Sequence, residues 1–120
     1  MHETGELVAL PVTEIKPVEA AFFDYQAKYT PGATEEITPA DIPDEMRDRI
    51  QAIALKAHVT MGCSGFSRSD MILSNDEPVW LEINTIPGMT ATSLLPQGAQ
   101  AIGMSYADLL TNIIEDSLSF

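Results

Sequence analysis

Two short strand-like segments on either side of a turn-rich segment constrain the fold of this chain most strongly. Residues 66–73 and 79–84 have the composition of β-strands, and the segment between them, residues 74–78, is rich in turn-forming residues. Two such runs joined by a short loop predict an antiparallel β-hairpin. Because side chains alternate along a strand, each face of the hairpin presents its own set of residues.

Residues 7–18 are expected to be extended. A long helix is predicted between this segment and the hairpin. Asp41 or Asp44 can cap this helix, and Gly62 ends it. Its apolar residues recur at helical spacing and form one stripe, which comprises Met46, Ile50, Ile53, Ala54, Ala57 and Met61. His58 lies beside this stripe, and we expect it to be a partly buried or surface residue and not a ligand.

Two further helices follow the hairpin. The shorter is predicted from Ser93 to about Ile102, closed by Gly103, and the last is an amphipathic helix capped by Ser105. The apolar face of the last helix comprises Tyr106, Leu109, Leu110, Ile113, Ile114 and Leu118. With the hairpin, these helices predict an α+β fold for residues 1–120 as a single domain, in which a mainly antiparallel sheet is flanked by helices.

The balance of charge argues against two classes of partner. The chain has 18 Asp and Glu against six Lys and Arg, a formal net charge of −12. We therefore expect neither nucleic acid nor an anionic membrane surface as a partner, and no apolar run reaches the roughly 18 residues that span a bilayer. The single Cys63 cannot form an internal disulfide, which is typical of a cytoplasmic protein.

The polar residues of the predicted hairpin suggest a metal site. Strand alternation places Arg68 and Asp70 on one face, and it places Glu82 and Asn84 on one face together with Trp80. Carboxylate and amide oxygens are hard donors, which suit Mg²⁺ and not zinc. The arginine, one side chain along the same face, is placed to contact a phosphate that the metal would carry.

The register across the hairpin decides whether these residues meet. If Leu73 pairs with Val79, Asp70 lies directly opposite Glu82, and the arginine lies opposite the asparagine; other registers remain open. Like charges directly opposite are destabilising unless a cation lies between them, so removing one carboxylate should weaken metal binding and relieve the repulsion. A surface hairpin whose polar face meets water has the same pattern, so the hairpin alone does not identify an enzyme.

The segments around the hairpin add specificity. Residues 80–90, WLEINTIPGMT, resemble the LEINTxPGMT signature of D-alanine–D-alanine ligases, and residues 61–70, MGCSGFSRSD, resemble the GCxGxxRxD segment of the same family. Residues 23–29, FDYQAKY, resemble its YDYxAKY loop, and residues 93–96 and 103–106 match its closing helices. The resemblance covers nearly everything from about residue 8 to residue 118, with the motifs in the right order and at compatible spacing.

The resemblance implies the C-terminal catalytic part of an ATP-grasp enzyme. Such an enzyme phosphorylates the carboxylate of one D-alanine with ATP, and the amine of a second D-alanine attacks the acyl phosphate to give the dipeptide for peptidoglycan. The residues that match Asp70, Glu82 and Asn84 are expected to hold two Mg²⁺ ions, for which Mn²⁺ can substitute, with Glu82 bridging them. Arg68 is expected to stabilise the acyl phosphate, and the backbone N–H of Gly88 is expected to help form the oxyanion site.

The remaining roles concern substrates. Ser93 and Leu94 correspond to the pair that receives the carboxylate of the second D-alanine. Lys28 and Tyr29 correspond to residues of a mobile loop, in which Lys28 reaches the γ-phosphate of ATP and Tyr29 hydrogen-bonds to the other half of the enzyme. Simpler interpretations exist: Gly88 as a type II turn glycine, Ser93 as an N-cap and Lys28 as a solvated loop lysine.

The chain departs from the family in length. Family members are more than twice as long, and the N-terminal substrate domain is absent here, as is most of the segment that carries the adenine pocket and the glycine-rich phosphate loop. We therefore expect the isolated chain to be catalytically inactive and to self-associate, as a homodimer or larger species.

Two alternative functions remain open. One is another ATP-grasp ligase, such as a D-alanine–D-lactate ligase, although Tyr29 favours the dipeptide. Carboxylase-type ATP-grasp enzymes are disfavoured because no arginine follows Asn84 closely. The other is a non-catalytic acidic module for metal binding or association.

Overall fold

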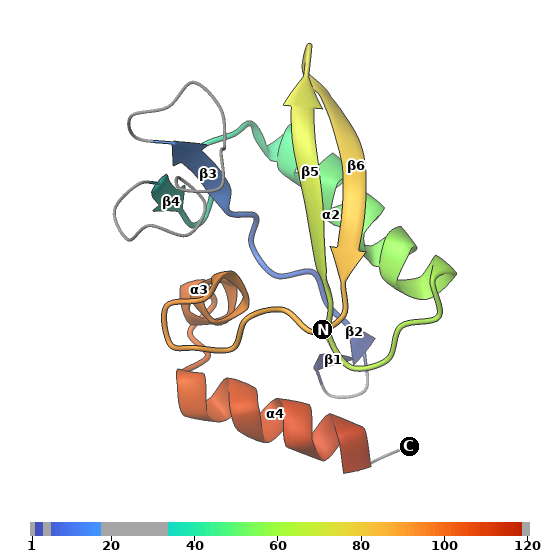
Figure 1. The fold of residues 1–120 in the computed structure, drawn as a ribbon, viewed down its shortest axis with the longest axis vertical. Helices are drawn as coiled ribbons and strands as arrows, with labels where there is room; N and C mark the ends of the chain where they lie inside the picture. The colour runs from blue at the N-terminus through green and yellow to red at the C-terminus, as the bar shows by residue number, and fades with distance from the viewer. Residues whose placement is uncertain (1, 4–5, 18–33, 119–120) are drawn as a thin grey trace.

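The computed structural model describes residues 2–3, 6–17 and 34–118, and Figure 1 shows the arrangement of the elements. The strands are β1 (His2–Glu3), β2 (Glu6–Leu7), β3 (Glu14–Pro17), β4 (Thr34–Ile37), β5 (Arg68–Ser74) and β6 (Glu77–Asn84). The helices are α2 (Asp44–Thr60), α3 (Leu94–Ala101) and α4 (Tyr106–Leu118).

The described strands form three separate antiparallel pairs, β1–β2, β3–β4 and β5–β6. The α+β class and the antiparallel pairing predicted from the sequence are therefore confirmed, but the strands do not join into one sheet. Residues 8–13 have no regular secondary structure, so the extended segment predicted for residues 7–18 is confirmed only at its two ends. Within this stretch Leu10 contacts α2, because the Gln51 side chain donates a hydrogen bond of 3.0 Å to its carbonyl oxygen.

The predicted hairpin is present, with a tighter turn than its sequence indicates. Ser74 pairs with Glu77, so only Asn75 and Asp76 form the turn, at φ of 52° and 61°. Two successive residues at positive φ define the type I′ turn, whose twist matches that of the flanking strands. The prediction of a five-residue loop is wrong because Asn and Asp both tolerate the left-handed region.

A β-bulge separates the turn from the base of the hairpin. Near the turn Leu73 pairs with Pro78 and not with Val79, whereas Asp70 pairs with Glu82 at the base. Leu81 has no partner in the ladder and takes up the one-residue difference between the two registers.

The bulge also changes the face on which Trp80 lies. Trp80 pairs with Met71, the neighbour of Asp70 that points to the opposite face, and its indole N–H donates to the Ser69 hydroxyl over 3.2 Å. The expectation that Trp80 shares a face with Glu82 is therefore wrong. The reason is the bulge, since one extra residue reverses the alternation.

Helix α2 packs against the β5–β6 hairpin and lies behind it in Figure 1. Its N-cap residue is Pro43, which offers no side-chain hydrogen bond, so the predicted cap at Asp41 or Asp44 is wrong. Asp44 instead lies in the first turn, where its negative charge interacts favourably with the positive end of the helix dipole. The helix ends as predicted at Gly62, whose φ of 71° closes the last turn, and Met61 is exposed and not part of the stripe.

The core of the described residues lies between α3 and α4. Ala99 and Leu109 are completely buried and Leu95 nearly so. The partly buried residues packed against this core are Leu10, Phe66, Met89, Met104 and Ile113. Tyr106, Ile114 and Leu118 are exposed, so only Leu109, Leu110 and Ile113 of the apolar face predicted for α4 are covered.

The ends of α3 and α4 agree with the sequence prediction. Gly103, at φ 85°, closes α3. The backbone N–H groups of Gly103 and Met104 donate hydrogen bonds to carbonyl oxygens in the last turn of the helix. The Ser105 hydroxyl accepts from the amide of Asp108 over 3.1 Å and so caps α4.

We predict that Asp76→Gly stabilises the protein. Glycine adopts positive φ without the Cβ clash, and the net gain after its larger unfolded-state entropy should be about 0.5–1 kcal/mol. Urea unfolding measures the change. Asp76→Ala is the matched control, since it removes the same charge but keeps the Cβ; if alanine stabilised as much as glycine, the gain would come from charge and not from the turn.

Candidate functional site

The base of the hairpin brings together the residues that the sequence predicts as metal ligands. Arg68 pairs with Asn84 and Asp70 pairs with Glu82 in the ladder. The Arg68 guanidinium donates from Nε to Oδ1 of Asp70 over 2.8 Å and from Nη2 to Oδ2 over 3.1 Å. Both side chains are partly buried, which strengthens this bidentate ion pair relative to a fully exposed ion pair.

The partner strand offers the other oxygen donors. Glu82 is exposed and its carboxylate forms no ion pair or hydrogen bond with any residue of the described ranges. Asn84 accepts a hydrogen bond of 2.9 Å from the amide of Ile86, which orients its carbonyl oxygen. The Arg68 guanidinium offsets the charge of Asp70 and so reduces its repulsion with Glu82. The charge of Glu82 itself is not offset by any described residue.

These donors fit a divalent cation by their chemistry. Two carboxylates and one amide oxygen at adjacent ladder positions are hard ligands, which suit Mg²⁺ or Mn²⁺. Within the described part of the chain, no three His, Cys, Asp or Glu side chains gather closely enough to form a site by themselves. The amide of Asn84 is therefore needed to complete the donor set.

The loop after β6 leads directly from this cluster to the start of α3. At Gly88 a Cβ would lie 2.9 Å from the Ser93 hydroxyl oxygen, so the two residues are in close contact and a larger side chain has no space. Gly88 is not among the glycines at positive φ, so its interpretation as a type II turn glycine is wrong. The requirement for glycine here is the approach of Ser93.

The Ser93 hydroxyl is held by Thr90 and not by the helix. Its oxygen accepts from the Thr90 amide over 3.1 Å and lies 2.7 Å from the Thr90 hydroxyl. Ser93 occupies the N-cap position of α3 but makes no capping hydrogen bond. Its interpretation as an N-cap is therefore correct in its position and wrong in the hydrogen bond that it implies. The first turn of α3, which includes Leu94, thus starts without a side-chain cap, and its amides and dipole favour an anion there.

Tyr106 anchors this loop from the opposite side. Its hydroxyl, at the start of α4, donates a hydrogen bond to the carbonyl oxygen of Met89. Pro87 in the same loop is buried. The loop between the predicted metal ligands and α3 is therefore fixed at both its proline and its methionine.

Lys28 and Tyr29 lie outside the described residues, so their predicted roles stay predictions. The strands on either side of them are described: β3 pairs with β4, and Pro17 and Thr34 are register partners. The described residues on either side of this segment, 17 and 34, are therefore neighbours in the fold.

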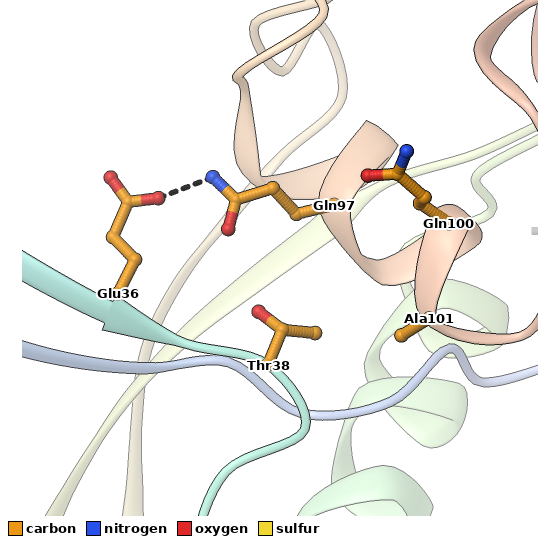
Figure 2. A pocket seen from close by; sticks show the side chains of 5 residues that line it. All are labelled: Glu36, Thr38, Gln97, Gln100 and Ala101. Carbon is orange, nitrogen blue, oxygen red and sulfur yellow. Dashed lines mark hydrogen bonds between the residues drawn. The ribbon is translucent and has the colours of Figure 1, made fainter.

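A shallow pocket of about 250 Å³ lies between the β4 segment and α3. It is lined by Glu36, Thr38, Gln97, Gln100 and Ala101, as Figure 2 shows. The Gln97 amide donates to the Glu36 carboxylate over 2.5 Å and to the carbonyl oxygen of Thr92 over 2.7 Å. This contact joins β4 to α3.

None of the sequence-predicted site residues lines this pocket. Glu36 and Gln97 belong to no periodic pattern or motif, so no signal in the sequence indicates that they meet. His58 also differs from expectation. It is 3% exposed, more deeply buried than predicted, and its Nδ1 lies 2.7 Å from the Ser67 hydroxyl.

None of the described helices is both long enough and apolar enough to cross a bilayer.

Comparison with known proteins identifies the family. The family model described as "D-ala D-ala ligase C-terminus" matches residues 1–115. The chain is 54% identical over 113 residues to the D-alanine–D-alanine ligase of Syntrophobacter fumaroxidans, which covers 93% of this chain and 36% of that protein. The chain thus spans about a third of the length of such relatives.

Solved structures agree with the sequence comparison. The crystal structure of D-alanine–D-alanine ligase from Bacillus anthracis complexed with ATP is similar with a TM-score of 0.76 at 35% identity, covering 92% of this chain and 34% of that one. The VanG D-Ala:D-Ser ligase from Enterococcus faecalis is similar with a TM-score of 0.76 at 40% identity, covering 92% and 32%. With its paired carboxylates and its glycine–serine loop in the expected order, the chain belongs to the D-ala D-ala ligase C-terminus family.

Proposed function

We propose that residues 1–120 act as one C-terminal catalytic domain in the ATP-dependent ligation of two D-alanines. The observation that carries the proposal is the pairing of Asp70 with Glu82 beside Arg68, in a chain of this family. The γ-phosphoryl group of ATP passes to the carboxylate of the first D-alanine, giving an acyl phosphate and ADP. The amine of the second D-alanine forms the new C–N bond, loses a proton, and expels phosphate.

The hairpin base provides the phosphate side of this site. Asp70, Glu82 and Asn84 would hold two Mg²⁺ ions, with Glu82 bridging them, and Mn²⁺ can replace Mg²⁺. When bound, such ions offset charge on the transferring phosphoryl group. Arg68 contributes a fixed guanidinium on the same face, where it is positioned to stabilise the acyl phosphate.

The loop and the first turn of α3 provide the acceptor side. The Ser93 hydroxyl and the Leu94 amide would receive the carboxylate of the second D-alanine, because the helix N-terminus favours an anion. The backbone N–H of Gly88, in contact with Ser93, would donate to the oxygen that becomes negative when the amine attacks.

Lys28 and Tyr29 complete the proposed site. Lys28 would reach the γ-phosphate of ATP, and Tyr29 would hydrogen-bond across the closed site to the rest of the enzyme. The pairing of β3 with β4 supports this, since it closes the base of their segment, and the Glu36–Gln97 hydrogen bond holds that base against α3.

A different acceptor is the second candidate. The similar VanG protein is named a D-Ala:D-Ser ligase, so D-serine, like D-lactate, is an acceptor to compare with D-alanine. The alternative from another functional class is that the chain is a non-catalytic acidic module for metal binding or association.

We further propose the cytoplasm as the compartment, because ATP is a substrate, and self-association of the chain as a homodimer. The exposed apolar residues Ile72, Val79 and Leu81 of the hairpin support association. Sedimentation of the purified chain tests it, and a monomer at high concentration would argue against it.

The activity is tested on the complete reading frame in which these residues are encoded. With ATP and Mg²⁺, we expect ADP release that depends on D-alanine, and D-alanyl-D-alanine identified by mass spectrometry. Parallel reactions with D-serine or D-lactate measure acceptor choice. Absence of every ligation product at saturating substrates would overturn the proposal in favour of the binding module.

We predict that Glu82→Gln weakens the binding of Mn²⁺ by about tenfold or more, because ligand charge sets the affinity of oxygen sites. The same change removes a like charge opposite Asp70 and should stabilise the metal-free protein by about 0.2–1 kcal/mol. Calorimetry measures both effects. Glu115→Gln, at an exposed position on α4, is the control with the same change of net charge; equal Mn²⁺ affinity in both variants would contradict a metal site at Glu82.

We predict that Gly88→Ala raises KM for the acceptor D-alanine by about tenfold, the equivalent of one lost hydrogen bond. The new Cβ forces the Ser93 hydroxyl to rotate away from Thr90. Gly103→Ala is the control, because it is strained at φ 85° but has open space around it and lies at the far end of α3. Steady-state kinetics measure KM, and a similar rise in both variants would trace the effect to general destabilisation.

A further inference from the structure

His58 has no part in the proposed chemistry, yet it is the one buried polar side chain in the described ranges, with 3% of its surface exposed. It lies in the last turn of α2, and its Nδ1 is 2.7 Å from the hydroxyl oxygen of Ser67. A hydroxyl can donate or accept, so this hydrogen bond forms with either tautomer of the imidazole. Breaking it would leave a buried polar group without this partner, which is costly.

Ser67 directly precedes β5, so the bond fixes the backbone where the site begins. Arg68 follows at once, and Asp70 lies two residues further along the strand. The same strand residues pair with Asn84 and Glu82. A shift of the chain at Ser67 would therefore move two of the proposed site residues relative to the other two.

Helix α2 holds the hairpin at two points of unequal strength. Near its start, Arg49 reaches the turn, where it donates to the Glu77 carboxylate over 2.6 Å. Both partners there are well exposed, so water and salt weaken that contact. The His58–Ser67 bond at the base is partly buried, with His58 itself almost fully buried, so water and salt weaken it less than the contact at the turn.

We propose that His58 and Ser67 are a pair of positioning residues that fix the start of β5 and thereby set how Arg68 and Asp70 face Glu82 and Asn84. The pair touches neither substrate nor metal. Its value to catalysis rests on the proposed function, because metal ligands and phosphate-binding groups act only when they are held in place. The positioning itself can be tested without any ligand.

The experiment compares four single variants and one double variant of the protein. His58→Leu fills the buried site but cannot form the bond, and Ser67→Ala removes the other partner. His58→Asn is the conservative variant, because the asparagine amide can donate or accept near the position of Nδ1. Leu109→Ala is the control for plain destabilisation, since Leu109 is a fully buried core residue between α3 and α4.

Hydrogen exchange of backbone amides is the first measurement. His58→Leu and Ser67→Ala should speed exchange about tenfold at residues 68–70 and 82–84, relative to α4, as expected when one buried hydrogen bond is lost. His58→Asn should restore protection, and Leu109→Ala should not produce this local pattern. Uniform acceleration throughout the protein, or unchanged exchange at the hairpin base in His58→Leu, would overturn the proposal.

Affinity for Mn²⁺, measured by calorimetry, is the second measurement. His58→Leu should weaken it by about tenfold, Asn should restore it, and adding Ser67→Ala to His58→Leu should cost nothing more, because both remove the same bond. If the unaltered protein binds no Mn²⁺, the metal site of the proposed function fails, and hydrogen exchange alone decides the positioning proposal. If it binds Mn²⁺ and His58→Leu binds equally well, the positioning proposal fails and the metal site stands.

Discussion

The pairing of Asp70 with Glu82 is the constraint around which the described part of the molecule is arranged. Two carboxylates directly opposite in a ladder repel each other, so a sheet keeps them there only if something offsets the charge. Arg68 does so for Asp70 through two hydrogen bonds. Glu82 has no such partner among the described residues, and that imbalance favours a cation at this position.

The register of the β5–β6 ladder changes once between the turn and the Asp70–Glu82 pair. The turn at Asn75 and Asp76 sets the pairing at the tip, and the bulge at Leu81 shifts it by one residue before the base. Bulges bend a strand and re-aim its side chains, so Trp80 and Glu82 point to opposite faces. The apolar middle of the hairpin, around Ile72 and Val79, and its polar base can therefore meet different requirements.

The second half of the site depends on close approach. Gly88, Thr90 and Ser93 form a compact loop that leads from β6 into α3, with Tyr106 bonded to the Met89 carbonyl oxygen behind it. The buried residues between α3 and α4 support this loop from below. The core thus stabilises the proposed acceptor side, whereas α2 stabilises the hairpin through the partly buried hydrogen bond of His58 with Ser67.

The sequence alone determined the α+β class, the hairpin, the three helices and the family, because turn residues, helix-closing glycines and motifs act over short stretches of chain. It also brought Asp70 and Glu82 together, although by assuming a longer loop and no bulge. Only the tertiary structure decided the bulge at Leu81, the side of the sheet that holds Trp80, the burial of His58 and the contact of Glu36 with Gln97. These depend on pairing and packing between segments distant in the sequence, and such energies have no local signature.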